Sequence, residues 1–182
     1  VALALAALVF LANGPLMRGA ERQAREAVSE RTAMAWLVGR HALLLAARGA
    51  RVVVNDPGVS MKGNDVDAGP AQEVVQEIIA AGGEALACTE SVATPAGGQA
   101  IVDAAMDNYG RIDILIHNAG TVRGASLKEM TQEDFDTVLD VHLRGAFHVV
   151  RPAFPIMCKA GYGRIVLTTS IGGLYGSYNQ AN

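Results

Sequence analysis

The sequence lacks the features that mark several classes of protein. Its formal net charge is −3 and it has no cluster of lysine and arginine, so it offers no electrostatic footprint for nucleic acid. Its two cysteines, Cys88 and Cys158, have neither the spacing of a metal site nor that of a disulfide framework. We expect both to be reduced core residues of an intracellular protein.

Long hydrophobic runs are absent as well. The longest, residues 1–12, is too short to cross a bilayer. No positively charged segment precedes it, as a signal peptide would require, so a buried strand or short helix explains it best. These absences predict a cytoplasmic protein with no membrane partner.

What is present is the composition of a globular domain. Hydrophobic residues make up 51% and charged residues 18% of the 182 positions, enough to bury a substantial core. From about residue 41 onward, short apolar runs alternate with segments of helical periodicity. We expect strands over 51–56, 84–92, 111–120 and 163–170, and helices before Arg51, over 70–81 and around 101–109.

A further long helix is predicted to begin at Thr131, because Asp134 three residues later resembles a capping box. Pro152 and Pro155 should kink or end this helix near its C-terminus. Its inward apolar face is predicted to contain Phe135, Val138, Leu139, Ala146, Phe147, Val149 and Val150.

Strands and helices that alternate in this way form parallel sheets with right-handed crossovers. The sequence therefore predicts an α/β protein with a doubly wound parallel sheet, Rossmann-like and incomplete at both ends. In this interpretation residues 41–182 form a partial dinucleotide-binding domain. Residues 1–40 lack the glycine spacing of a nucleotide-binding turn, and we expect an atypical N-terminal segment that is foreign to the fold.

Ligands of such sheets bind at the carboxyl ends of the strands, where polar residues stand. Asp56 could accept hydrogen bonds from both ribose hydroxyls of NAD and would repel the extra phosphate of NADP. An aspartate that starts a turn before Pro57 and Gly58 explains the same residue equally well. Asn118 and Gly120 suit the edge of a ligand site, but a simple strand-to-loop turn uses the same residue types.

Two further residues have side chains suited to chemistry. His142 lies on the inward face predicted for the long helix, where most histidines are hydrogen-bonded core residues. His41, His117 and His148 complete no metal-ligand spacing with it, so we expect no metal. Ser170 ends the last predicted strand, where its hydroxyl would either donate to a substrate carbonyl or satisfy the backbone of a turn.

Together these segments resemble the short-chain dehydrogenase/reductase family. The stretches HALLLAARGARVVVND, IDILIHNAG, VHLRGAF and GRIVLTTS occur in the family's order and at its spacing, across residues 41–182. The segments VVVNDPG, DVHLRG and GLYGSYNQAN are most similar to one branch. That branch contains the (3R)-hydroxyacyl-CoA dehydrogenase domain of the multifunctional β-oxidation enzyme.

The resemblance implies a role for each candidate residue. Asp56 would bind the adenosine ribose, Ser91 and Val92 would lie beside the adenine, and Ser170 would polarise the substrate carbonyl. His142 takes the place of the asparagine that usually holds a proton-relay water. The cofactor-binding set implied in this way is Gly39, Asp56, Ser91, Val92, Asn118, Ala119 and Gly120, and the cofactor is NAD in preference to NADP because of the aspartate.

Two departures from the family pattern matter. The T-G-x-x-x-G-x-G turn is absent, because only Gly39 and Arg40 look like its tail and they stand one residue too close to His41. The Y-x-x-x-K motif, whose tyrosine exchanges the alcohol proton, would begin at the residue after Asn182. We therefore expect the chain as given to be inactive or severely impaired.

Three interpretations follow. The first is an NAD(P)-dependent oxidoreductase acting on the CH–OH or C=O group of a small alcohol or ketone, with a 3-hydroxyacyl thioester suggested by the branch. The alternative is an inactive truncated fragment that binds nucleotide weakly or pairs with a full-length relative. Homo-oligomers are usual in the family but doubtful for a chain cut short. A flavodoxin-like or receiver-type domain is the third, and no acidic cluster or phosphate loop supports it.

Overall fold

The computed structural model describes residues 42–58 and 69–182. The atypical segment 1–40, including Gly39, lies outside these residues, so the predictions made for it stay predictions. In chain order the elements are β1 (Arg51–Asn55), α3 (Gly69–Ala80), β2 (Glu84–Cys88), α4 (Pro95–Tyr109), β3 (Ile114–His117), α5 (Gln132–Leu139), the π-helical turn η1 (Asp140–Arg144), α6 (Gly145–Ala160), β4 (Arg164–Leu167) and α7 (Ile171–Tyr175).

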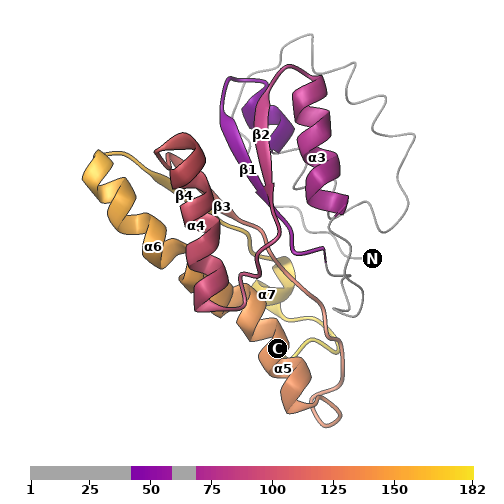
Figure 1. Ribbon diagram of the computed structural model, residues 1–182. Helices are drawn as coiled ribbons and strands as arrows, with labels where there is room; N and C mark the ends of the chain where they lie inside the picture. The colour runs from indigo at the N-terminus through magenta and orange to yellow at the C-terminus, as the bar shows by residue number, and fades with distance from the viewer. Residues whose placement is uncertain (1–41, 59–68) are drawn as a thin grey trace.

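The strands pair in parallel, as their alternation with helices requires. β1 pairs with β2 from Arg51↔Glu84 to Asn55↔Cys88, and β3 pairs with β4 from Ile114 to His117. The α/β class with parallel, Rossmann-like strands is therefore confirmed. Among the described residues the strands form two separate pairs (Figure 1). In the strand order of dinucleotide-binding sheets, a first strand would stand between them.

Each strand pair has its own hydrophobic core. In the first, Ile78 of α3 is fully buried and packs with Val54 of β1 and with Ala46, which belongs to the helical residues 42–46. In the second, Leu115 of β3 packs with Ala153 of α6 and with side chains of α4. Figure 1 shows the same division, with α3 beside β1 and β2, and with α4 and α6 beside β3 and β4.

The helix ends follow from local chemistry. Thr94 caps α4, since its side chain accepts a hydrogen bond from the Gly97 amide at 3.0 Å. Thr131 caps α5 in the same way, by accepting from the amide of Asp134 at 3.0 Å. The Asp134 carboxylate accepts a hydrogen bond from the Thr131 hydroxyl at 2.8 Å. The predicted N-cap at Thr131 is thus confirmed.

The long helix is interrupted where the sequence did not predict it. α5 ends at Leu139, and a π-helical turn follows in which the amide of Gly145 donates to the carbonyl of Asp140. α6 then runs through Pro152 and Pro155 and ends only at Ala160. Of the two outcomes predicted for the prolines, a kink or an end of the helix, the end is wrong, and the kink stays a prediction. The break lies upstream, at a turn that holds one residue more than an α-helical turn.

Two predicted core residues lie at the surface. Phe147 is 61% exposed, because it lies two residues from the buried Gly145 and Val149 and therefore on the opposite side of α6. Cys158 is also exposed, near the C-terminus of α6, whereas Cys88 is buried as expected. Both thiols are free.

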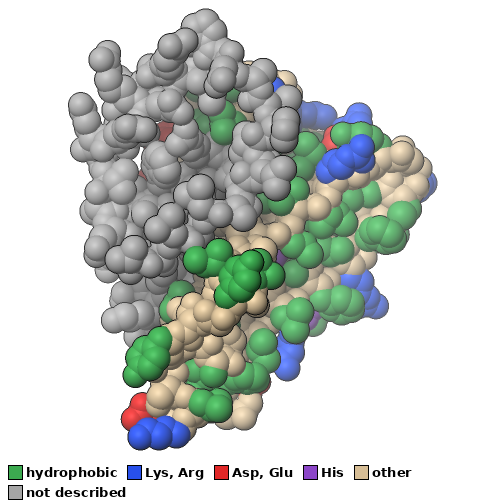
Figure 2. Space-filling view, turned by 180° about the vertical axis from the view of Figure 1, so that it is seen from behind, with side chains coloured by type: hydrophobic (Ala, Val, Ile, Leu, Met, Phe, Trp, Pro, Cys, Tyr) green, Lys and Arg blue, Asp and Glu red, His purple; other side chains and the backbone are tan. Residues whose placement is uncertain are grey.

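Hydrophobic side chains remain exposed on one face of the β3–β4 pair. Ile114, Ile116 and Val166 are between 40% and 49% exposed and share this face, since alternate residues of a strand point the same way. Exposed hydrophobic side chains are conspicuous in the space-filling view (Figure 2). Within 42–58 and 69–182, no helix is long and apolar enough to cross a membrane.

The contact between α4 and α6 depends on a glycine. A Cβ atom at Gly98 would lie 2.5 Å from the backbone carbonyl oxygen of His148 in α6. Because this neighbour is backbone, we expect Gly98→Ala to push the helices apart and to destabilise the fold by about 1–3 kcal/mol. Urea unfolding would measure the change. Gly173→Ala is the control, because its nearest neighbour would be a Thr169 oxygen at 3.8 Å, and equal effects of the two substitutions would contradict the prediction.

Candidate functional site

The side chain of His142 is seated on the turn that follows β3. Its Nε2 atom lies 2.9 Å from both the amide nitrogen and the carbonyl oxygen of Thr121. A neutral ring protonated on Nδ1 accepts from the amide, whereas a ring protonated on Nε2 donates to the carbonyl. The contact between helix and turn can therefore persist in either tautomer and in the charged ring.

Gly120 makes room for this ring. A Cβ atom at that position would lie 2.9 Å from Cε1 and 3.2 Å from Nε2 of His142. The glycine of the HNAG segment thus serves a close approach, as the sequence suggested, and the described neighbour that needs the space is a protein side chain. The prediction of an inward-facing His142 is wrong, because the ring is exposed and reaches the turn from the π-helical segment.

His117 is the buried member of the site. It ends β3 and is only 7% exposed, which makes it the one buried polar or charged residue in the described part of the chain. Its Nε2 atom has no hydrogen-bond partner. Burial lowers the pKa of His117 below its ordinary value of 6.5, hydrogen bonding to the backbone of His142 and Val141 opposes this, and repulsion from His142 adds to the lowering.

Asp56 stands directly after β1. Its amide donates to the carbonyl of Cys88 at 3.0 Å, which continues the β1–β2 pairing by one residue. Its Oδ1 atom accepts from the amide of Gly58 at 2.8 Å, and Gly58 has a φ of 70°. The turn that the sequence offered as an alternative explanation is therefore present. It uses one carboxylate oxygen, and the other has no hydrogen-bond partner among the described residues.

Ser91 and Val92 follow β2 and differ in environment. Ser91 is exposed, and its hydroxyl accepts from the Ala93 amide at 3.3 Å. Val92 is 7% exposed and belongs to the second core, together with the partly buried Ala119. The carbonyl of Val92 lies 2.9 Å from Nδ1 of His148. The described chain thus leaves Ser91 open to a ligand and holds the Val92 side chain in the core.

Ser170 lies three residues beyond the end of β4 rather than on it. It caps α7, where its Oγ atom accepts from the Gly172 amide at 3.1 Å. The prediction that Ser170 ends the strand is wrong, because β4 pairs only as far as Leu167. The side chain is exposed, and accepting one hydrogen bond leaves its own proton available for donation.

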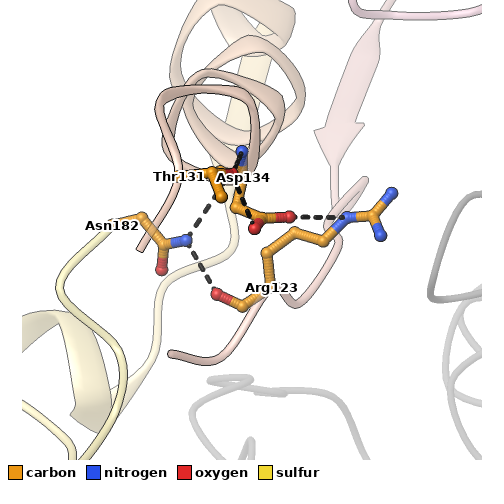
Figure 3. Close-up of polar contacts among 4 residues, drawn as sticks. All are labelled: Arg123, Thr131, Asp134 and Asn182. Carbon is orange, nitrogen blue, oxygen red and sulfur yellow. Dashed lines mark hydrogen bonds and ion pairs between the residues drawn. The ribbon is translucent and has the colours of Figure 1, made fainter. Parts of the chain in front are cut away.

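The segment after Ser170 returns to the segment after Gly120. Ala125 and Gln180 form an isolated parallel bridge. The side-chain amide of Asn182 donates to the carbonyl of Arg123 at 2.9 Å and to that of Asp134 at 3.4 Å. Figure 3 shows Asn182 between these two residues, with Arg123 beside the Asp134 carboxylate. The β3 and β4 ends of the site are therefore tied together.

The structure thus joins some candidate residues directly and others only through neighbours. Asn118, Ala119 and Gly120 lie on the turn that His142 contacts. Ser170 reaches that turn through the segment 177–182, and Asp56 is tied to the end of β2. Sequence reasoning missed Thr121 and the burial of His117, although the HNAG segment contains the histidine. Within the described ranges no three His, Cys, Asp or Glu residues gather as a metal site.

Parallel strands joined by helices, with polar residues at their carboxyl ends, define a Rossmann-like α/β protein. A family model of short chain dehydrogenases matches residues 39–182, and the chain belongs to that family. It is 45% identical over 142 residues to a peroxisomal multifunctional enzyme type 2 of Drosophila melanogaster. These residues are 78% of this chain and 23% of that protein. Similarity to such enzymes agrees with the hydroxyacyl-CoA dehydrogenase branch recognised in the sequence.

In bacterial relatives the matched region is a larger share of the whole protein. A short-chain type dehydrogenase/reductase of Mycobacterium tuberculosis is 43% identical over 142 residues, 78% of this chain and 50% of that protein. The crystal structure of a short chain dehydrogenase from Mycobacterium avium superposes with a TM-score of 0.70 at 44% identity, over 79% of this chain and 52% of that one. The chain thus spans at most about half the length of these relatives.

The comparisons correct one prediction. A cytoplasmic location was expected from the absence of targeting and membrane signals, but several of the relatives are peroxisomal by name. Peroxisomal import depends on a short signal that a receptor recognises, so the absence of a signal peptide or a membrane span does not bear on it. The cytoplasmic prediction is therefore contradicted.

We expect the contact between His142 and Gly120 to be sensitive to one methyl group. In Gly120→Ala the new Cβ would overlap the imidazole, so the ring must leave the turn, at a cost of about 1–3 kcal/mol in unfolding free energy. The same substitution in a His142→Ala background should cost much less, because the clashing ring is gone. Denaturant unfolding of the native chain, the two single variants and the double variant gives the coupling free energy between Gly120 and His142. Equal costs of Gly120→Ala in both backgrounds would refute the contact.

The pKa of His117 also predicts how stability depends on pH. Because its pKa is lowered in the folded chain, the unfolded chain binds the proton more readily between 6.5 and the lowered value. The stability due to His117 is thus full above pH 6.5 and declines as the pH falls through that interval, by at most about 1.4 kcal/mol per pH unit. Unfolding curves of the native chain and of His117→Asn should diverge over this interval, and parallel curves would contradict the prediction.

Proposed function

We propose that the carboxyl edge of these strands is the site of an NAD-dependent oxidoreductase that interconverts a CH–OH group and a C=O group. The observation that supports it best is the seating of His142 on the Gly120–Thr121 backbone. This contact fixes the turn at the end of β3, where a strand-end ligand would lie. Membership of the short-chain dehydrogenase family implies a nicotinamide cofactor at that edge.

Asp56 supports NAD over NADP. Its partly buried carboxylate uses Oδ1 to hold the turn at Gly58 and retains a second oxygen for a ribose hydroxyl. Charge-assisted hydrogen bonds of this kind are stronger than neutral ones. The extra phosphate of NADP would meet the same negative charge and be repelled. These properties fit the adenosine ribose of NAD.

The remaining residues would orient the substrate and the cofactor. The bound nicotinamide supplies the hydride acceptor or donor. Ser170 is exposed and can donate its hydroxyl proton to the carbonyl oxygen, which stabilises the negative charge that develops there. His142 holds the Asn118–Gly120 turn, and Ser91 is open at the end of β2. In this proposal Gly39 belongs to the phosphate turn.

For the substrate we propose a 3-hydroxyacyl thioester. The support is similarity to the hydroxyacyl-CoA dehydrogenase branch, together with the DVHLRG segment that forms the π-helical turn. The fold alone selects no substrate, since unrelated alcohols and ketones are handled on the same scaffold.

A second candidate function is nucleotide binding without turnover by the 182-residue polypeptide alone. Residues 1–182 contain no Tyr-x-x-x-Lys, so a polypeptide of these residues alone would lack that acid–base group, and such a loss typically costs about 10²–10⁴ in rate. Binding of NAD with no oxidation of 3-hydroxyacyl-CoA would favour this candidate, whereas measurable turnover would favour the enzyme.

A cofactor titration tests the proposal. We expect NAD at millimolar concentration to raise the thermal unfolding midpoint more than NADP does. In Asp56→Asn, which keeps the acceptor for Gly58, NAD should bind about tenfold more weakly and the preference over NADP should shrink. Asp103→Asn, on the exposed surface of α4, is the charge-matched control. No response to either dinucleotide would refute the proposed site.

A further inference from the structure

The segment 171–182, which follows Ser170, has no hydrophobic core of its own. α7 contains no buried residue, and in the whole segment only Gly172 and Asn182 are not exposed. Its large apolar and aromatic side chains are between 56% and 93% exposed, namely Ile171, Leu174, Tyr175 and Tyr178. Burial of apolar surface is ordinarily the main source of stability. Because it contributes little here, the position of this segment depends on polar contacts.

The side-chain amide of Asn182 makes two of these contacts. Its Nδ2 atom donates at 2.9 Å to the carbonyl of Arg123, in the turn that follows β3, and at 3.4 Å to the carbonyl of Asp134, in the first turn of α5. An NH₂ group has two protons, so it can serve both acceptors at once. Figure 3 shows the amide of Asn182 between Arg123 and the start of α5. One partly buried side chain thus joins the segment 171–182 to both.

The residues that accept from Asn182 are also joined to each other. The Nε atom of Arg123 lies 4.0 Å from one carboxylate oxygen of Asp134. The other oxygen of this carboxylate accepts a hydrogen bond from the Thr131 hydroxyl at 2.8 Å, and the Thr131 side chain caps α5. The turn after β3 and the start of α5 therefore form one unit, and Asn182 binds to two carbonyls of that unit.

The same segment packs beside the Ser170 hydroxyl. A Cβ atom at Gly172 would lie 2.9 Å from Oγ of Ser177, 3.3 Å from Oε1 of Gln180 and 3.5 Å from Oγ of Ser170. The Gly172 amide donates to the Ser170 hydroxyl at 3.1 Å. The returning chain therefore lies against the glycine that the Ser170 hydroxyl contacts, and a displacement of Gln180 changes the surroundings of Ser170.

We propose that Asn182 is a positioning residue for Ser170. Its amide holds the segment 171–181 against the turn after β3, and in this way it fixes the Ser170 hydroxyl relative to that turn. The proposal rests on the proposed function in one respect, because Ser170 acts on a substrate only if these strand ends are an active site. It assigns Asn182 no contact with substrate or cofactor.

The substitution Asn182→Asp tests the hydrogen bonds with almost no change of shape. At pH 7 it replaces the NH₂ donor by a carboxylate oxygen that faces two carbonyl oxygens. We expect the amide protons of Gly172 and Gln180 to exchange with solvent about fivefold or more faster, because the segment opens locally. The thermal unfolding midpoint should stay close to that of the native chain, since the two hydrophobic cores are untouched.

The pH profile of this variant separates hydrogen bonding from packing. Below a pH of about 3.9 the introduced carboxyl group is neutral and can donate its proton to a carbonyl. Protection relative to the native chain at the same pH should then recover, whereas Asn182→Ala has no donor at any pH and should not recover. The charged groups near this amide are the Arg123 guanidinium, the Asp134 carboxylate and the α-carboxylate of the 182-residue polypeptide. All three proteins share them, so the comparison holds them constant.

The matched control is Asn179→Asp. It introduces the same charge into the exposed part of the segment, at a residue whose φ of 58° both asparagine and aspartate tolerate. It should leave the exchange of Gly172 and Gln180 unchanged. Unaltered exchange in Asn182→Asp, an equal effect of Asn179→Asp, or no recovery of Asn182→Asp at low pH would overturn the proposal.

If Asn182→Asp does not fold, the native chain still decides. Nuclear Overhauser effects between the side-chain amide protons of Asn182 and the backbone protons of Arg123 and Gly124 are then expected, and their absence overturns the proposal. These readouts need no cofactor, so they are independent of the dinucleotide titration. A chain that ignores NAD while Asn182 holds the segment refutes the proposed function alone, whereas a chain that binds NAD but fails these tests refutes the role of Asn182 alone.

Discussion

The site depends on one contact, the hydrogen bond between the His142 ring and the Thr121 backbone. It joins the π-helical turn to the turn that follows β3, 21 residues earlier in the chain. An asparagine amide can donate and accept at the same time, whereas a single imidazole nitrogen does one or the other. The histidine accordingly holds the turn through one atom in each protonation state, and Gly120 keeps the space above the turn open for the ring.

Packing in the rest of the described chain positions His142 against the Thr121 backbone. The Gly98 contact with the His148 backbone sets how closely α4 approaches α6, and Gly145 at the start of α6 leaves room for the Val92 side chain, which follows β2. The π-helical turn lies between the two helical segments and directs His142 toward the strand ends. The elements are thus aligned by close contacts at glycines that leave no room for a methyl group, as expected where two elements are held at a fixed separation.

Most of the fold could be predicted from the sequence, because its signals are local. They are the period of the apolar residues, the helix cap at Thr131 and the paired glycines after Ala81, which end a helix. The π-helical turn could not, since its extra residue leaves the composition of the segment ordinary. The orientation of His142 was mispredicted for that reason, whereas Phe147 was assigned to the inward face although it lies only two residues from the buried Gly145 and Val149. Asp56 was found by its place in the chain, and its turn to Gly58 is a local pattern, but its amide bond to the Cys88 carbonyl is tertiary and has no sequence pattern.

The exposed face formed by Ile114, Ile116 and Val166 has a consequence for how the polypeptide behaves in solution. Apolar patches on neighbouring molecules attract one another, and only mutual charge repulsion keeps the molecules apart. The formal net charge is only −3 at pH 7 and moves toward zero as the pH falls. Mild acidification should therefore favour colloidal precipitation, and storage at alkaline pH and low ionic strength should preserve a monodisperse sample.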